Sequence, residues 1–157
     1  MAEPRRRECV LILKRIVDAP IERVWRAWTD PAELGQWFVA GEDHVVHFCD
    51  VDLRIGGLFH VGFGPPGQPP FVENNRYTEI VRPTRLAWVG EITVDGEVVK
   101  VGEGGGIDFV DLGEGKTQVV ITTVGDEDAW RHAEGWIANL NRLQRFLAGE
   151  LAEVADG

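Results

Sequence analysis

The feature that most constrains the fold is an apolar stripe in residues 126–152, near the C-terminal end of the sequence. Apolar side chains recur there at the three- and four-residue spacings of one helix face, and charged side chains occupy the opposite face. Such a helix must bury its apolar face, and only a sheet built from the middle of the chain offers enough surface. The stripe consists of Trp130, Ala133, Ile137, Leu140, Leu143, Leu147 and Leu151, with Trp136 beside it.

The middle of the chain has the two-residue period of β-strands. Its strand-like runs are separated by short turn-forming segments such as Gly56-Gly57, Arg82-Pro83-Thr84 and Asp95-Gly96, and by a Pro-rich hairpin loop at 64–70. Connections this short join antiparallel neighbours, because parallel strands need long crossovers. The predicted strands cover residues 44–50, 58–63, 75–81, 86–94, 106–112 and 118–124.

The N-terminal part predicts one strand followed by two short helices. Residues 10–17 are rich in β-branched side chains and form the first predicted strand. Pro20 suits the first position of a helix, and Asp30 followed by Pro31 and Glu33 has the pattern of a second helix start with a capping box. The predicted helices cover residues 20–29 and 31–37.

These patterns together predict an α+β protein. We expect a curved antiparallel sheet of six or seven strands, two short helices after the first strand, and a long C-terminal helix packed over the sheet around a cavity. A chain of 157 residues has the usual size of one domain, so we expect a single domain over residues 1–157. The cluster Arg5-Arg6-Arg7 is expected to belong to a flexible tail formed by residues 1–7.

The charge of the chain disfavours two classes of partner. Its 26 acidic and 16 basic side chains give a formal net charge of −10. This field repels nucleic acid and acidic membrane surfaces, so we expect neither nucleic-acid binding nor membrane insertion. The two cysteines, Cys9 and Cys49, have no disulfide or zinc-ligand spacing and are expected to stay reduced, which favours a cytoplasmic location.

We expect no metal and no cofactor. The most metal-like cluster contains His44, His47, Cys49, Asp50 and Asp52. Alternation along a strand would place Asp50 and His47 on opposite faces, and no second pair of Cys or His completes a zinc site. The Gly-rich stretch 102–106 lacks the Lys-Ser/Thr of a phosphate loop, so we interpret it as a hairpin connection at the cavity mouth.

Four stretches of the sequence carry a resemblance to a known superfamily. In this order and at these spacings they cover nearly the whole chain. They are residues 16–31 continuing to Leu34 and Trp37; residues 52–59; residues 77–80 followed by Pro83, Arg85-Leu86 and Trp88; and Gly135-Trp136 followed by Leu140 and Leu143.

The sequence resembles the helix-grip superfamily (START-like, also called SRPBCC), and within it the branch named for the activator of the ninety-kilodalton heat-shock chaperone ATPase (AHSA-like). The resemblance implies a deep cavity between the concave face of the sheet and the C-terminal helix. It implies no single activity, because members include lipid carriers, ligand sequesterers, cyclases and chaperone cofactors.

Apolar side chains that share one strand parity are expected to line this cavity, together with residues of the helices. Ile107 shares the parity of one of them, Phe109. A filled core without a usable void is the alternative. The expected lining residues are Trp37, Phe38, Phe59, Val61, Phe63, Tyr77, Leu86, Trp88, Phe109, Trp136 and Leu140.

Three functions fit this fold, and binding a small hydrophobic molecule for carriage, sequestration or sensing needs the fewest special residues. A cyclase- or hydrolase-type enzyme would need a buried acid–base pair at the cavity, for which Glu73, Tyr77, Glu79, Asp108 and Asp111 are candidates. A chaperone cofactor or protein-interaction module would show an exposed apolar patch instead. No nucleophile elbow or Cys/His pair is visible, so we expect binding without catalysis; a homodimer is compatible with the sequence, and no segment is devoted to chaperone docking.

Overall fold

A computed structural model describes residues 9–38, 44–101, 105–125 and 130–149. The predicted flexible tail and most of the Gly-rich stretch lie outside these ranges. The elements in chain order are β1 (Cys9–Val17), α1 (Ile21–Thr29), α2 (Pro31–Trp37), β2 (Val45–Val51), β3 (Leu58–Gly64), β4 (Phe71–Val81), β5 (Arg85–Val94), β6 (Glu97–Val101), β7 (Gly105–Gly113), β8 (Lys116–Gly125) and α3 (Trp130–Leu147).

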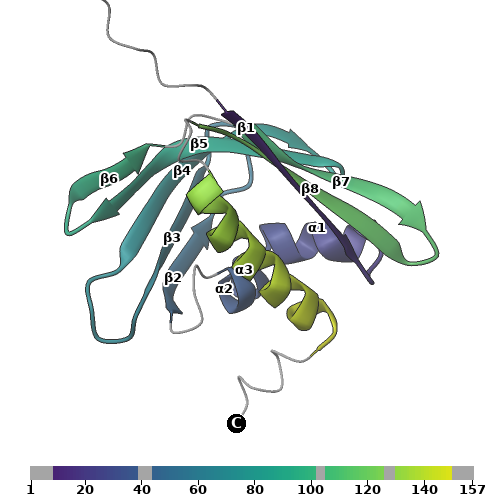
Figure 1. Cartoon of the computed structure of the whole chain (residues 1–157), viewed down its shortest axis with the longest axis horizontal. Helices are drawn as coiled ribbons and strands as arrows, with labels where there is room; N and C mark the ends of the chain where they lie inside the picture. Colours follow the sequence, from purple (N-terminus) through teal and green to yellow (C-terminus); the bar gives the residue numbers. More distant parts are fainter. Residues whose placement is uncertain (1–8, 39–43, 102–104, 126–129, 150–157) are drawn as a thin grey trace, which may run out of the picture.

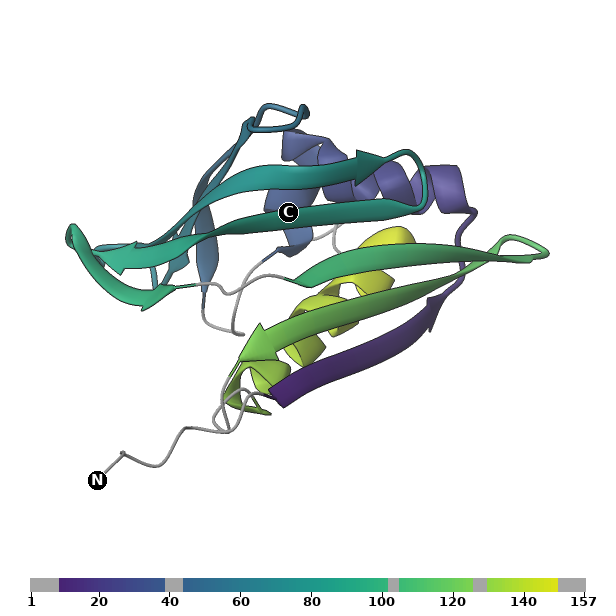
Figure 2. The ribbon, with the colours of Figure 1, turned by 90° about the horizontal axis from the view of Figure 1, so that it is seen from above.

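The strands form one curved antiparallel sheet, and the helices lie on its concave side (Figures 1 and 2). Its order is β1-β8-β7-β5-β4-β3-β2, with β6 paired to β5, so the sheet has eight strands with β1 and β2 at its edges. The helix α3 crosses the concave face, and α1 and α2 close one end of it. The predicted α+β helix-grip architecture is confirmed.

The strand β6 is the element that the sequence patterns did not predict. Asp95 and Gly96 both have positive φ, the conformation of a tight two-residue hairpin turn, and β6 returns from this turn along β5. The turn was recognised from its Asp-Gly pair, but the run 97–101 that follows it was not assigned to a strand.

The two short helices share one residue, and this changes the predicted cap. The Asp30 carboxylate accepts a hydrogen bond from the Ala32 N–H at 2.9 Å, as expected of an N-cap. The Asp30 N–H, however, donates to the Arg26 carbonyl at the end of α1 (2.9 Å). It therefore has no need of the Glu33 side chain, which pairs instead with the arginines of α1.

The predicted stripe of α3 differs from the structure at one residue. Leu140 and Leu143 are buried and Leu147 packs against the core, as predicted, whereas Ile137 is 41% exposed. Asn139 and Phe146, which were not assigned to the stripe, are also buried. The Trp136 ring packs onto the rings of α1 and of the segment after α2.

The N-cap of α2 allows a direct test. We expect Asp30→Ala to lower the free energy of unfolding by about 0.5–2 kcal/mol, since it removes the acceptor for the Ala32 N–H. Asp30→Asn keeps an oxygen acceptor and should cost much less. Urea denaturation of both variants checks this, and equal losses would show that the cap is not the source of the effect.

Candidate functional site

The space between the sheet and the helices is filled by aromatic rings. Trp28 of α1 contacts Trp37 of α2 at 4.7 Å between ring centroids, and it stacks on Trp136 of α3 at 6.2 Å. Phe59 of β3 lies 5.0 Å from the Trp88 ring of β5 and 5.6 Å from the Phe38 ring. One continuous aromatic cluster therefore joins α1, α2, α3 and the sheet.

All the residues expected to line a cavity belong to this core. Most of them are fully buried and packed against one another in the described part of the chain. Only Trp88 and Trp136 are partly exposed. The buried ones are Trp37, Phe38, Phe59, Val61, Phe63, Tyr77, Leu86, Phe109 and Leu140.

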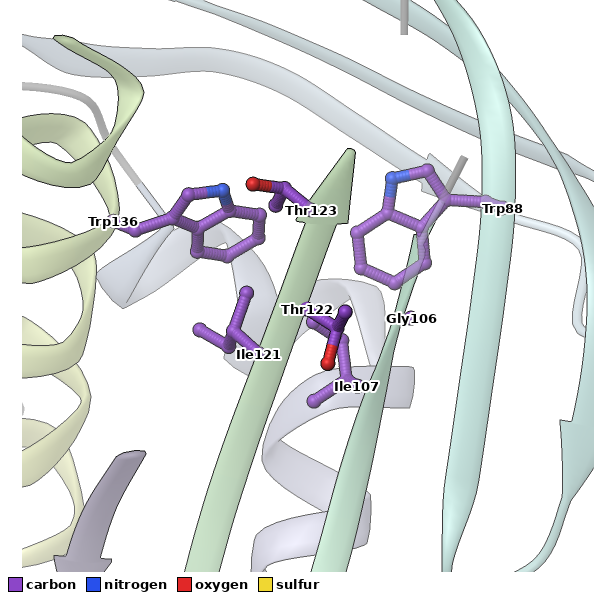
Figure 3. Close-up of a pocket in the computed structure, with 7 residues that line it drawn as sticks. All are labelled: Trp88, Gly106, Ile107, Ile121, Thr122, Thr123 and Trp136. Carbon is purple, nitrogen blue, oxygen red and sulfur yellow. The ribbon is translucent and has the colours of Figure 1, made fainter. Parts of the chain in front are cut away.

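A pocket of about 50 Å³ remains at one end of the cluster. In Figure 3 the Trp88 ring, from β5, and the Trp136 ring, from α3, stand on its two sides, and side chains of β7 and β8 lie between them. None of its lining residues is charged. The lining residues are Trp88, Gly106, Ile107, Ile121, Thr122, Thr123 and Trp136.

The sequence analysis named three of these seven residues and missed Gly106, Ile121, Thr122 and Thr123. Parity offered a signal for two of the missed ones, because Ile121 and Thr123 alternate along β8 with the inward-facing Val119. No sequence signal marked the pocket's place, since it depends on where two strands of the sheet separate.

That separation lies between β5 and β7, whose described residues pair only at Arg85↔Asp108 and Leu86↔Ile107. Beyond Leu86, β5 continues away to pair with β6, whereas β7 stays paired with β8. We call this short contact the β5–β7 seam. The pocket lies beside this seam. Its lining includes Gly106, the residue before Ile107 on β7, and Trp88, two residues after Leu86 on β5.

One arginine holds the seam together. The Arg85 Nη1 donates to Asp108 of β7 at 2.8 Å, and its Nε donates to Glu79 of β4 at 2.7 Å. These hydrogen bonds raise the pKa of the guanidinium, which is charged at any physiological pH. The guanidinium covers Gly106, where an added Cβ would lie 2.7 Å from an Arg85 nitrogen, so Gly106 makes this close approach available.

Several buried polar atoms have no hydrogen-bond partner among the described residues. The Thr123 hydroxyl is one of them, and it belongs to the pocket lining. The others come from separate parts of the fold. They are Trp28 Nε1 in α1, His44 Nδ1 just before β2, Asn75 Nδ2 and Tyr77 Oη in β4, and Asn139 Oδ1 in α3. Buried groups of this kind are ordinarily satisfied by water or a ligand.

The acid–base candidates do not form a catalytic pair at the pocket. Glu79 and Asp108 bind Arg85, and Asp111 accepts the Gly113 N–H in the β7–β8 turn. Tyr77 is buried. This burial and, to a smaller extent, the nearby Cys49 raise the pKa of its phenol. Glu73 lies opposite the buried Val61 of β3, and it is not among the pocket-lining residues.

The metal-like cluster is dispersed along β2 and its ends. Asp52 pairs with Arg54, and Cys49 packs near Gly35 of α2. The ring of His60, a third histidine outside this cluster, lies 4.7 Å from the Phe48 ring. Among the described residues, no group of three or more His, Cys, Asp or Glu side chains could hold a metal ion.

Comparison with known proteins agrees with this geometry. Residues 18–148 match the family described as activator of Hsp90 ATPase homolog 1-like protein. The chain belongs to this family. An AHSA1-like protein from Aeromonas hydrophila, known from a solution NMR structure, is 27% identical and superposes with a TM-score of 0.73, with 91% of this chain and 95% of that chain covered.

Two crystal structures show the same fold at lower identity. A protein of Nitrosomonas europaea is 24% identical with a TM-score of 0.74, covering 90% of this chain and 95% of its own. A putative uncharacterized protein from Rhizobium leguminosarum is 23% identical with a TM-score of 0.76, covering 93% and 98%. No curated protein matches the chain. No helix in the described part of this AHSA1-like protein is long and apolar enough to cross a membrane.

Gly90 provides a test of the packing on the concave face. It pairs with Asn75 of β4, and an added Cβ would lie 2.0 Å from the Asn74 carbonyl oxygen. We expect Gly90→Ala to cost about 1–3 kcal/mol of unfolding free energy, as overpacking does. Gly35→Ala is the matched control, because its Cβ would meet only ordinary contacts at 3.6 Å inside α2. Equal chemical-denaturation midpoints for the two variants would contradict the close approach.

The half-buried thiol of Cys49 provides a second test. Partial burial, with a smaller contribution from Asp50, raises the pKa of Cys49 from 9.0 to about 12. In a Cys9→Ser background, native Cys49 should react with iodoacetamide at pH 8.5 more than about 100-fold slower than in urea, because only the thiolate reacts. Ordinary native reactivity would show that the surroundings of Cys49 do not raise the pKa of its thiol.

The same pKa shift predicts how stability depends on pH. Above about pH 9 the unfolded chain loses the thiol proton, whereas the folded chain keeps it until about pH 12. The unfolded state then binds fewer protons, so the free energy of unfolding should fall as the pH rises through this window. Cys49→Ala should weaken the decline, as measured by urea denaturation at pH 8, 9 and 10.

Proposed function

We propose that this protein binds a small, uncharged, largely apolar molecule between Trp88 and Trp136. The pocket between these two rings carries the proposal, since it is an uncharged opening into the aromatic interior. Proteins of this fold family commonly bind hydrophobic ligands, and the pocket lies between the sheet and α3. Carriage, sequestration or sensing would each use such a site.

The size of the pocket implies that the ligand opens it. A volume of about 50 Å³ has room for only a few water molecules, whereas drug-sized ligands occupy roughly 300–1,000 Å³. The partly exposed Trp88 and Trp136 rings are the side chains that can turn outward, and the two-pair β5–β7 seam is the weakest junction beside them. In this proposal the structure is the closed state, and a ligand favours an open one.

The chemistry of the interior indicates what the ligand carries. The Thr123 hydroxyl in the pocket lining has no partner among the described residues, and Trp28, Asn75 and Tyr77, outside the lining, present further unpartnered donors that an opened site would expose. The raised pKa of Tyr77 keeps its phenol protonated at neutral pH. Oxygen acceptors on a ligand would satisfy them, and flat rings would stack on the tryptophans. A carboxylate is a poor fit, because no cation lines the pocket and burying an unpaired charge is costly.

The same groups favour binding over catalysis. Cys49 and Tyr77 are both protonated at neutral pH, so neither provides a nucleophile or a general base there. The carboxylates Glu79 and Asp108 are engaged with Arg85. We place the protein in the cytoplasm, where a free thiol such as Cys49 stays reduced.

A thermal-shift screen tests the proposal. The panel should contain neutral aromatic polyketides, flavonoids and sterols, with fatty acids as the anionic comparison. A ligand at a hundred times its Kd adds about 2.7 kcal/mol and should raise Tm by roughly 5–10 °C in a domain of this size. We expect the shift from neutral ring compounds and none from fatty acids.

Two variants locate the bound molecule. Ile107→Phe fills the pocket and should abolish the shift, whereas Val110→Ala changes an exposed side chain of the same strand and should leave it intact. Circular dichroism confirms that each variant is folded. The proposal fails if no compound shifts Tm, or if a shift survives in Ile107→Phe.

A further inference from the structure

A second hollow lies on the outside of the molecule, between α1 and two connections of the sheet. It is an open groove of about 480 Å³ that shares no residue with the Trp88–Trp136 pocket. We call it the α1 groove. Its lining residues are Glu22, Arg23, Trp25, Arg26 and Thr29 of α1, Leu53 between β2 and β3, and Arg82 between β4 and β5.

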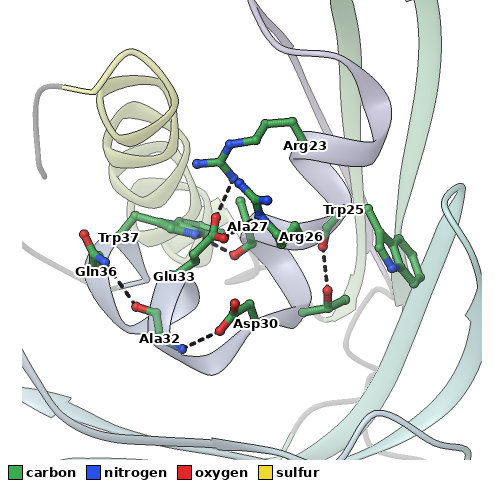
Figure 4. Close-up of polar contacts among 10 residues, drawn as sticks. Arg23, Trp25, Arg26, Ala27, Asp30, Ala32, Glu33, Gln36 and Trp37 are labelled. Carbon is green, nitrogen blue, oxygen red and sulfur yellow. Dashed lines mark hydrogen bonds and ion pairs between the residues drawn. The ribbon is translucent and has the colours of Figure 1, made fainter.

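Positive charge dominates the α1 groove, although the whole chain carries −10. Arg23 and Arg26 share one partner, Glu33 of α2, with 2.6 Å between Arg26 Nε and Glu33 Oε2 (Figure 4). Arg82 contacts Glu22 at 3.1 Å. Two glutamates thus hold three arginines in place without neutralising them, and the Arg26 and Arg82 side chains remain 59% and 70% exposed.

Large aliphatic side chains stand beside these arginines. Leu53 of the groove wall is 40% exposed, and Ile55, two residues later, is 64% exposed. Val81, next to Arg82 in the chain, is 53% exposed. Arginine is enriched at protein–protein interfaces, and the exposed aliphatic side chains next to the groove add apolar area that a partner would bury.

The connection that carries Leu53 and Ile55 is fixed to the sheet by backbone hydrogen bonds. The Gly56 N–H donates to the Tyr77 carbonyl at 2.8 Å, and the Tyr77 N–H donates to the Gly57 carbonyl at 3.0 Å. Arg76 also donates to the Gly56 carbonyl at 3.2 Å and brings one more positive charge to this connection. The apolar side chains are therefore presented on an ordered backbone, which lowers the entropy cost of docking.

We propose that the α1 groove docks an acidic segment of a partner protein that also carries apolar side chains. The carboxylates of the segment would approach Arg26 and Arg82, and its apolar side chains would cover Leu53 and Ile55. Complementary charge would make association faster and sensitive to salt. This inference does not depend on ligand binding in the Trp88–Trp136 pocket.

The test uses the ¹⁵N-labelled full chain and a twelve-residue peptide of alternating Glu and Leu. A peptide with Lys in place of Glu is the charge control, and an oligothymidine of the same length is a polyanion without aliphatic side chains. We expect chemical-shift changes clustered at Arg26, Leu53, Ile55 and Arg82 with the acidic peptide. Its affinity should exceed that of the Lys peptide at least tenfold and should fall as salt is added.

Charge-reversal pairs separate the groove from net charge. The double variant Arg26→Glu with Arg82→Glu should lower the affinity for the acidic peptide at least tenfold. Lys14→Glu with Lys116→Glu is the matched control, because it changes the net charge equally at exposed sites outside the groove, and it should have little effect. The double variant Leu53→Ser with Ile55→Ser should lower the affinity for the acidic peptide and leave oligothymidine binding unchanged.

Four outcomes would overturn the proposal. The first is that millimolar acidic peptide causes no chemical-shift change, and the second is that the two charge-reversal pairs lower the peptide affinity equally. The third is that oligothymidine binds as tightly as the peptide and that the two serine substitutions have no effect. The fourth is that sedimentation shows a dimer, which the charge reversal in the groove dissociates. The third outcome would indicate a general polyanion site. The fourth would indicate that a second copy of this chain occupies the groove.

Discussion

The Trp28 ring is the contact on which the rest of the structure depends. It touches Trp37 of α2, Phe109 of β7 and Trp136 of α3, so one side chain of α1 joins two other helices and the sheet. Aromatic pairs of this kind contribute both buried area and a preferred geometry. Trp136 packs onto this ring, and its neighbour Ile137 is exposed. The pocket lies between Trp136 and the place where β5 and β7 part.

Much of the fold follows from patterns that are local in sequence. Periods of two and of three to four residues distinguish strands from helices, and Asp30-Pro31 marks the start of α2. Residues such as Phe59 and Leu140 were assigned to the interior for the same reason. What local patterns do not contain is the place where neighbouring strands part. Gly106 and Thr123 line the pocket because β5 leaves β7 after two residue pairs, and that depends on the pairing of segments about twenty residues apart.

The charged residues show a similar limit. Glu33 has the spacing of a capping box, yet its carboxylate is used by Arg23 and Arg26, because α1 already takes the Asp30 N–H. That arrangement orders the arginines of the α1 groove. The inside and the outside of this AHSA1-like protein thus have different chemistries: neutral and aromatic at the Trp88–Trp136 pocket, and cationic with aliphatic neighbours at the α1 groove. The two could operate in one molecule without sharing a residue.

A neutral ring compound is proposed to occupy the space between Trp88 and Trp136. The six tryptophan indole N–H signals report on it directly in ¹H–¹⁵N NMR spectra. We predict that such a compound shifts the Trp88 and Trp136 signals together, and that the Trp25 signal, from the α1 groove, stays in place. Unchanged Trp88 and Trp136 signals under saturating compound, or a shift confined to Trp25, would contradict the account.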